Sequence, residues 1–93
     1  MSVEFDPNKR QTTLAERSLD MAQAGSVFAG PTLTIEDDRK NYGEKRYITI
    51  GFLDNRMVVL AWTQRGPNKR IISMRKANDR EQAHYEPRLR DAL

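Results

Sequence analysis

Three strand-like segments joined by two very short turns constrain the fold of this 93-residue chain most strongly. The segments are residues 47–52, 57–63 and 70–75, and the apolar residues of the first fall on alternate positions. Asp54-Asn55 and Gly66-Pro67-Asn68, which separate them, are residue types that tight turns favour. Because short turns join neighbouring antiparallel strands, the sequence predicts a meander. Its middle strand is apolar on both faces and is therefore expected at the centre of the sheet.

The part of the chain before the meander predicts two helices and two further strands. A short strand at residues 3–5 is followed by Asp6-Pro7, which is typical of a helix start with Asp6 as N-cap. Apolar residues at helical spacing predict a second helix over residues 21–28. Alternation at residues 32–36 predicts a strand that enters the meander.

A last helix is predicted from Asn78 onward, because Asn78 and Glu81 have the spacing of a capping box. Pro87 is expected to kink or end this helix, and the charged tail after about residue 87 to fray or to be ordered only by a partner. The elements together predict an α+β fold, in which an antiparallel sheet of about four strands has two N-terminal helices and one C-terminal helix. Residues 1–93 are expected to form a single domain.

Composition excludes several classes of site. The chain has no cysteine and one histidine, which excludes disulfides and thiolate metal sites and argues against a compact zinc site. The longest apolar run, residues 57–62, is far shorter than the roughly 20 residues of a membrane span. The N-terminus also lacks the apolar segment of a signal peptide. We therefore expect a cytoplasmic protein with no cofactor, no metal and no membrane contact.

Positive charge gathers in the last third of the chain. Residues 65–93 carry eight Lys or Arg and four Asp or Glu, and residues 65–80 hold six basic residues against one acidic residue, Asp79. Such a local excess favours a polyanion as partner. The alternative is that these cations are ordinary solvated charges, which also protect strand edges from aggregation.

The third strand of the meander should divide its cations between two faces. Ser73 and Arg75 are expected on one face and Arg70 on the other. The remaining cations lie near the two ends of this strand: Arg65, Lys76 and Arg80. We therefore expect a cation cluster around the ends of one sheet, which can bind several phosphates.

RNA cleavage without a metal ion requires few catalytic groups from the protein, because the 2′-hydroxyl of the RNA is itself the nucleophile. The protein has to align it, transfer protons and stabilise charge on the phosphate, and arginine suits the last task because its guanidinium binds phosphate bidentately. Spacing does not choose among the candidates for proton transfer, which are Glu44, Lys76, His84 and Tyr85. Purely structural roles stay open for three residues. His84 can face water, Glu44 can pair with Arg46, and Trp62 can pack in the core.

Four motifs along the chain form a consistent set. The most specific is the run Arg-Ile-Ile-Ser-Met-Arg-Lys-Ala at residues 70–77, followed by a capped helix with Glu81 and Tyr85. The others are Glu44-Lys45-Arg46 with Gly51, Trp62-Thr63-Gln64-Arg65-Gly66, and Phe5-Asp6-Pro7 with Lys9. From about residue 3 to residue 85, the chain thus resembles the BrnT family of ribonuclease toxins.

The resemblance implies a RelE-like fold and a metal-independent endoribonuclease that inhibits translation and growth. It implies a BrnA-like ribbon-helix-helix antitoxin as partner and RNA as substrate, with operator DNA bound only through the antitoxin. The catalytic residues that it implies are Glu44, Arg65, Arg70, Arg75 and Lys76. RNA binding is assigned to Arg46, Ser73, Arg80 and Tyr85.

The first helix departs from the family pattern. Many members carry Lys-His-Gly where this chain has Glu16-Arg17-Ser18, so the family histidine is missing and the first helix is not expected to serve catalysis. Two alternatives to an active enzyme stay open. One is a non-catalytic RNA-binding module, or degenerate toxin, that acts through its antitoxin complex. The other is a regulatory protein whose cations engage an acidic protein.

Overall fold

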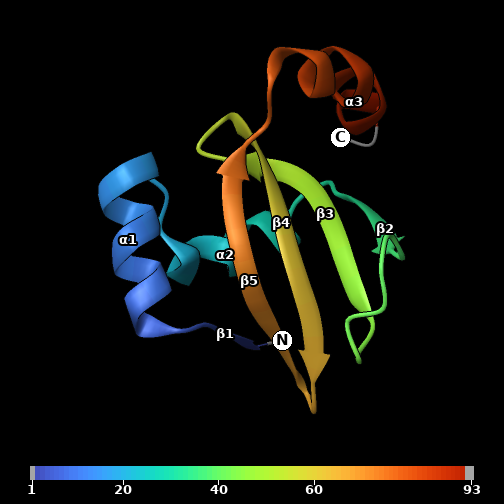
Figure 1. Cartoon of the computed structure of the whole chain (residues 1–93). Helices are drawn as coiled ribbons and strands as arrows, with labels where there is room; N and C mark the ends of the chain where they lie inside the picture. Colours follow the sequence, from blue (N-terminus) through green and yellow to red (C-terminus); the bar gives the residue numbers. More distant parts are fainter. Residues whose placement is uncertain (1, 92–93) are drawn as a thin grey trace.

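The computed structural model describes residues 2–91 and has the predicted α+β organisation (Figure 1). In chain order the elements are β1 (Ser2–Glu4), α1 (Pro7–Arg17), the 3₁₀ turn η1 (Met21–Gln23), α2 (Ala24–Phe28), β2 (Leu33–Asp37), β3 (Arg46–Leu53), β4 (Arg56–Arg65), β5 (Asn68–Lys76) and α3 (Asp79–Asp91). The predicted second helix is therefore a 3₁₀ turn followed by a short α-helix. Within residues 2–91, no helix is long and apolar enough to cross a membrane.

The sheet has five strands in the order β1-β5-β4-β3-β2. The meander from β2 to β5 is antiparallel, as predicted. The prediction of about four antiparallel strands is nevertheless wrong in one respect, because β1 adds a fifth strand that runs parallel to β5. Sequence reasoning identified this short strand but not its partner, since its pairing spans only three residues at the far end of the sheet.

Local signals at turns and caps are confirmed. Asp54 and Asn55 both have positive φ, 51° and 65°, as a two-residue turn with the twist of a hairpin requires. Asp6 accepts a hydrogen bond from the backbone N–H of Asn8 at 2.8 Å, so it caps α1 with Pro7 as the first helical residue. The second hairpin turn is one residue shorter than predicted, because β5 already begins at Asn68.

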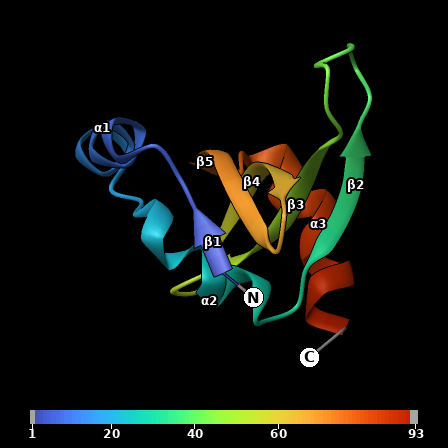
Figure 2. The same ribbon diagram turned by 90° about the horizontal axis from the view of Figure 1, so that it is seen from below.

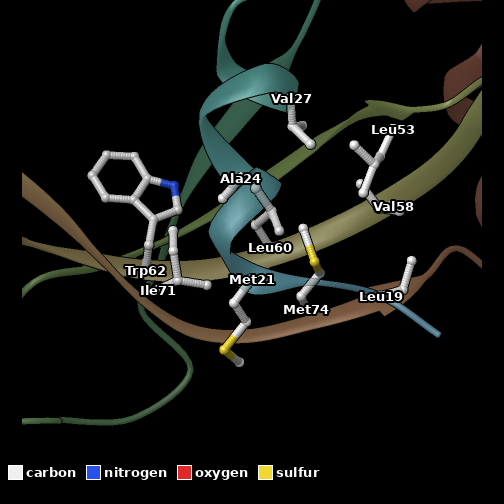
Figure 3. Packing of buried hydrophobic residues seen from close by; sticks show 10 residues of the cluster. All are labelled: Leu19, Met21, Ala24, Val27, Leu53, Val58, Leu60, Trp62, Ile71 and Met74. Atoms are coloured by element: carbon white, nitrogen blue, oxygen red, sulfur yellow. The ribbon is translucent and has the colours of Figure 1, made fainter. Parts of the chain in front are cut away.

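One face of the sheet, called the helix face below, carries the larger core. Residues of η1 and α2 such as Met21 and Val27 pack there on Leu60, Trp62 and Met74 of the sheet (Figure 3). The prediction that Trp62 is a core residue is confirmed, since it is 7% exposed and donates a hydrogen bond to Thr49 Oγ1 at 2.8 Å. This packing holds η1 and α2 on the helix face.

Gly51 lets α2 approach the sheet closely. A Cβ atom added at Gly51 would lie 2.7 Å from Val27 Cγ1 and 3.1 Å from Thr32 Cγ2. Carbon atoms do not pack as close as 2.7 Å, so only glycine fits this position without a shift of Val27 or of the helix that carries it.

The opposite face, called the open face below, is covered only in part, by α3. Leu89 is 1% exposed and packs with a second cluster that includes Ile50, Met57 and Val59. Pro87 does not end α3, as one expectation had it, because the helix continues to Asp91. Burying a leucine contributes about 1.5–3 kcal/mol, which holds the last turn in place. Residues 88–91 are helical and residues 92 and 93 lie outside the described residues, so the fraying of the tail stays a prediction.

Candidate functional site

A one-residue bulge in β5 decides which side chains share a face. Ser73 lies opposite Ala61 of β4, whereas Ile71 lies opposite the next residue of β4, Trp62, so Ile72 is one residue in excess. Because side chains alternate along a strand, one extra residue reverses the faces of everything beyond it.

The bulge corrects the predicted faces of β5. Ile71 and Met74 both lie in the core of the helix face. Arg70, Ser73 and Arg75 therefore all project to the open face, whereas the sequence placed Arg70 opposite the other two. The bulge thus gathers on one face three residues that a regular strand would separate.

A cleft of about 420 Å³ lies on the open face between the β2–β3 connection and α3. Its floor is apolar and comes from the middle of β3 and β4: Ile48, Ile50, Val59 and Ala61. Asp37 and Arg39 line one wall, and the other consists of Ser73, Arg75, Glu81 and Tyr85. Of the predicted site residues, the cleft therefore brings together Ser73, Arg75 and Tyr85.

Arg75 is held at the cleft by a bidentate contact with Glu81. Nη1 and Nη2 of Arg75 donate to the two carboxylate oxygens of Glu81 at 2.8 and 2.9 Å. The hydrogen bonds from Arg75, and then that from the backbone N–H of Asn78, lower the pKa of Glu81 to about 2 against the opposing effect of burial. Asn78 Oδ1 in turn accepts from the N–H of Glu81 at 2.8 Å, which confirms the predicted capping box.

Sequence reasoning missed the arginine on the opposite wall. Arg39 donates from Nε and Nη2 to Asp37 at 2.7 and 2.9 Å, and the Tyr42 hydroxyl donates to the same carboxylate at 3.1 Å. These contacts, first of all the hydrogen bonds from Arg39, hold the pKa of Asp37 well below its usual range. The available signal was the charged connection between the second and third strands, which gives no indication of where its side chains point.

A second cluster forms around Glu44 at the other end of the open face. Glu44 lies 3.4 Å from Nε of Arg46 and 3.5 Å from Nη2 of Arg65, so it contacts two arginines through single, long contacts. The expected pairing of Glu44 with Arg46 is confirmed. Arg46 also stacks on the ring of Tyr42, with its guanidinium carbon 4.1 Å from the ring centroid.

The strand positions that carry Arg46 and Arg75 lie apart along the sheet. Arg75 is in register with Val59 and Ile50, and Ile50 is four residues along β3 from Arg46. At the rise of an antiparallel strand this spacing is about 13 Å. Glu44 and Arg75, both predicted as catalytic, are therefore separated.

The other predicted cations take different positions. Arg70 lies 4.0 Å from Glu4 at the β1 edge. Lys76 is opposite Val58, a core residue of the helix face, and so projects away from the cleft. Arg80 is exposed in the first turn of α3.

Carboxylates accompany every arginine of the open face. Within the described residues, five such arginines pair with four carboxylates, because Glu44 contacts two of the arginines. The pairs are Arg39–Asp37, Arg46–Glu44, Arg65–Glu44, Arg70–Glu4 and Arg75–Glu81. The pairing fixes the guanidinium groups in defined orientations and neutralises much of their charge.

Glu81 and Tyr85 lie one turn apart on α3 and both line the cleft. Tyr85 is half-buried against the apolar cluster beneath α3. His84 is exposed, as expected, with its ring edge-on to that of Tyr85 at 4.7 Å between centroids.

Residues 5–81 match the family described as the ribonuclease toxin BrnT of type II toxin-antitoxin systems. The match spans β2 to β5 and both residues of the Arg75–Glu81 pair, and it begins just after β1. None of the curated proteins is significantly similar to the chain.

Proposed function

This chain belongs to the BrnT family of type II ribonuclease toxins, and we propose that it is an endoribonuclease whose reaction takes place in the cleft of the open face. In this proposal residues 1–93 are one toxin domain. It cuts RNA in the cytoplasm without a metal ion, inhibits translation and growth, and is neutralised by a ribbon-helix-helix antitoxin.

The observation that carries the proposal is the position of Arg75 at the wall of the cleft. Its guanidinium is fixed by Glu81, and a preorganised cation stabilises the charge that builds on a phosphate in the transition state. Glu81 binds the two Nη atoms, so the Nε–H of Arg75 is left to face a phosphate oxygen. Ser73 lies beside it on the same face.

Glu81 and Tyr85 are suited to the two proton transfers. The RNA 2′-hydroxyl loses its proton to Glu81 as the bond from 2′-oxygen to phosphorus forms. Tyr85 gives a proton to the 5′-oxygen as its bond to phosphorus breaks, which leaves a 2′,3′-cyclic phosphate and a 5′-hydroxyl. A phosphate at the Nε–H of Arg75 offsets the positive charge beside Glu81, which raises the pKa of Glu81 and makes it a better base.

Residues at the other end of the open face are assigned to RNA binding. The backbone rows of Arg46 and Arg75 lie about 13 Å apart, which favours different roles for Glu44 and Arg75. Glu44 is therefore assigned to orient Arg46 and Arg65, which contact flanking nucleotides. Arg70 and Arg80 contribute charge on either side of the cleft.

Within residues 2–91 there is no group of three or more His, Asp or Glu side chains that could hold a metal ion. The direct experiment incubates purified protein with RNA in excess chelator and identifies the ends of the products. Cleavage that leaves 2′,3′-cyclic phosphate ends supports the proposal. Folded protein that leaves RNA intact, or a reaction abolished by the chelator, contradicts it.

The antitoxin is assigned to the same face. Ile35 is 54% exposed and is in register with Ile48 of the cleft floor, so an apolar strip lies beside Arg39 and Arg75. This surface fits the apolar side of an amphipathic segment of a BrnA-like antitoxin, and operator DNA is then contacted only by the antitoxin. Ile35→Glu should weaken the toxin–antitoxin complex, and an unchanged complex would place the antitoxin elsewhere.

A non-catalytic RNA-binding module is the second candidate, and the carboxylates favour it. A base with a pKa of about 2 accepts protons poorly, and each arginine of the open face is already paired. Such a module would bind RNA with a steep salt dependence and would not cut it. The cleavage experiment separates the two functions.

A further inference from the structure

A groove on the other side of β5 carries cations that the cleavage site does not use. β1 pairs only with residues 68–70 of β5, so α1 covers the rest of that strand edge (Figure 1, Figure 2). Lys9 Nζ of α1 donates to the carbonyl oxygen of Ile72 at 3.5 Å, and Arg17 Nη1 donates to that of Met74 at 2.8 Å. Two cations of α1 are thereby fixed along the edge of β5.

The charge of this groove differs from that of the cleft. Among residues 2–91, no carboxylate lies within 4.0 Å of a charged nitrogen of Lys9, Arg17 or Lys76. Glu16 is the acidic residue at the rim. The cleft, in contrast, is lined by two arginines and by the carboxylates of Glu36, Asp37, Asp38 and Glu81. A polyanion therefore meets uncompensated positive charge in the groove and not in the cleft.

The groove and the cleft meet at the edge of β5. Ser73 lines both the cleft and the hollow beside Lys9 and Arg17. Arg75 lines both the cleft and the hollow formed by Arg17, Ser18 and Lys76. A strand of RNA held at Arg75 thus has a continuous path from one surface to the other.

We propose that the groove between α1 and β5, with Lys9, Arg17 and Lys76, binds phosphates of the RNA that flank the one in the cleft. This inference rests on the proposed function and assigns different roles in RNA binding to the cleft and the groove. Paired arginines of the cleft orient the reacting phosphate, while the uncompensated cations of the groove supply affinity without sequence preference. Lys9 and Arg17 are eight residues apart on α1, about 12 Å, so they contact different phosphates.

The test measures the affinity for 2′-O-methyl RNA, which lacks the attacking hydroxyl, by fluorescence anisotropy over a range of salt concentrations. Each phosphate contact that is lost should reduce the slope of log Kd against log salt by about 0.7 for single-stranded RNA. Arg17→Ala and Lys9→Ala should each produce this reduction, and the double variant about twice as much. Arg17→Lys keeps the charge and should retain the slope even if losing the contact with Met74 costs stability.

Arg88→Ala is the matched control, because Arg88 is an exposed cation of α3 that lines neither the cleft nor the groove. The inference is overturned if Arg17→Ala and Lys9→Ala behave like this control. It is also overturned if they weaken binding of a polyglutamate probe but not of RNA, since the groove then serves an acidic protein. Cleavage by the unmodified protein is measured in parallel. If the unmodified protein cleaves RNA but the Lys9 and Arg17 variants have unchanged salt slopes, only the role of the groove is refuted. If these variants have reduced salt slopes but the unmodified protein does not cleave RNA, only the proposed function is refuted.

Discussion

Arg75 and Glu81 join the end of β5 to the first turn of α3 through two hydrogen bonds of 2.8 and 2.9 Å. The same carboxylate accepts the N–H of Asn78 at 2.9 Å and so helps to cap α3. One side chain thereby orients the arginine of the proposed site and begins the helix that forms a wall of the cleft. Stability and activity are consequently coupled at Glu81.

The first prediction concerns stability at acid pH. The folded protein holds the pKa of Glu81 at about 2, below the value of 4.5 that is usual for the side chain. The stabilisation is therefore fully present above about pH 4.5 and is lost as the pH falls toward 2. Urea unfolding of the wild type and of Glu81→Gln over this range should give free energies of unfolding that converge as the pH falls. Asp37 is present in both proteins, so its contribution cancels in the difference between their free energies of unfolding. A difference that stays constant with pH would assign the acid sensitivity to other groups.

The second prediction concerns Arg75. Arg75→Ala removes the cation that faces the reacting phosphate and should lower the cleavage rate by about a hundredfold to a thousandfold. Arg10→Ala is the matched control, because Arg10 also forms a bidentate pair, with Asp20 at 2.8 and 3.0 Å, away from the cleft. Equal rates for the two variants under conditions in which both are folded would remove Arg75 from the site.

Signals confined to a few neighbouring residues predicted the local structure. The cap at Asp6 and the capping box of Asn78 with Glu81 depend on side chains that bond to nearby backbone groups, and the turn at Asp54-Asn55 depends on residue types that tolerate positive φ. The meander could be predicted from the sequence because short turns leave its strands few ways to pair. Trp62 was predicted in the core from its place on a strand that is apolar on both faces.

The site was harder to predict because it depends on pairing across the sheet. Nothing local marks Ile72 as the extra residue of a bulge, yet this bulge decides that Arg70 and Arg75 share a face. Arg39 belongs to a connection whose path is set by its contacts with Asp37 and Tyr42. Charge counting also could not reveal that each arginine of the open face has a carboxylate partner.

The third prediction tests the approach of α2 to the sheet. Gly51→Ala would put a Cβ atom 2.7 Å from Val27 Cγ1 and should destabilise the protein by about 1–3 kcal/mol. Gly25→Ala is the control, because no atom lies within 4 Å of its added Cβ and alanine favours a helix. Thermal unfolding should lower the Tm of the first variant and leave or raise that of the second. A Gly51→Ala protein as stable as the wild type would mean that α2 can shift at little cost.

The last prediction assigns the proton donor. Tyr85→Phe keeps the ring that packs beneath α3 and removes only the hydroxyl, so the fold should persist. If Tyr85 protonates the leaving 5′-oxygen, the cleavage rate should fall by about a hundredfold or more, because general acid catalysis contributes on that order. Tyr47→Phe makes the same chemical change on the helix face, where Tyr47 stacks on Trp62 at 4.7 Å between ring centroids. A substrate with a 5′-thio leaving group, which departs without a proton, should restore most of the rate of Tyr85→Phe. A variant that is slow with both substrates would show that Tyr85 acts through packing, and one as fast as Tyr47→Phe would exclude it as the acid.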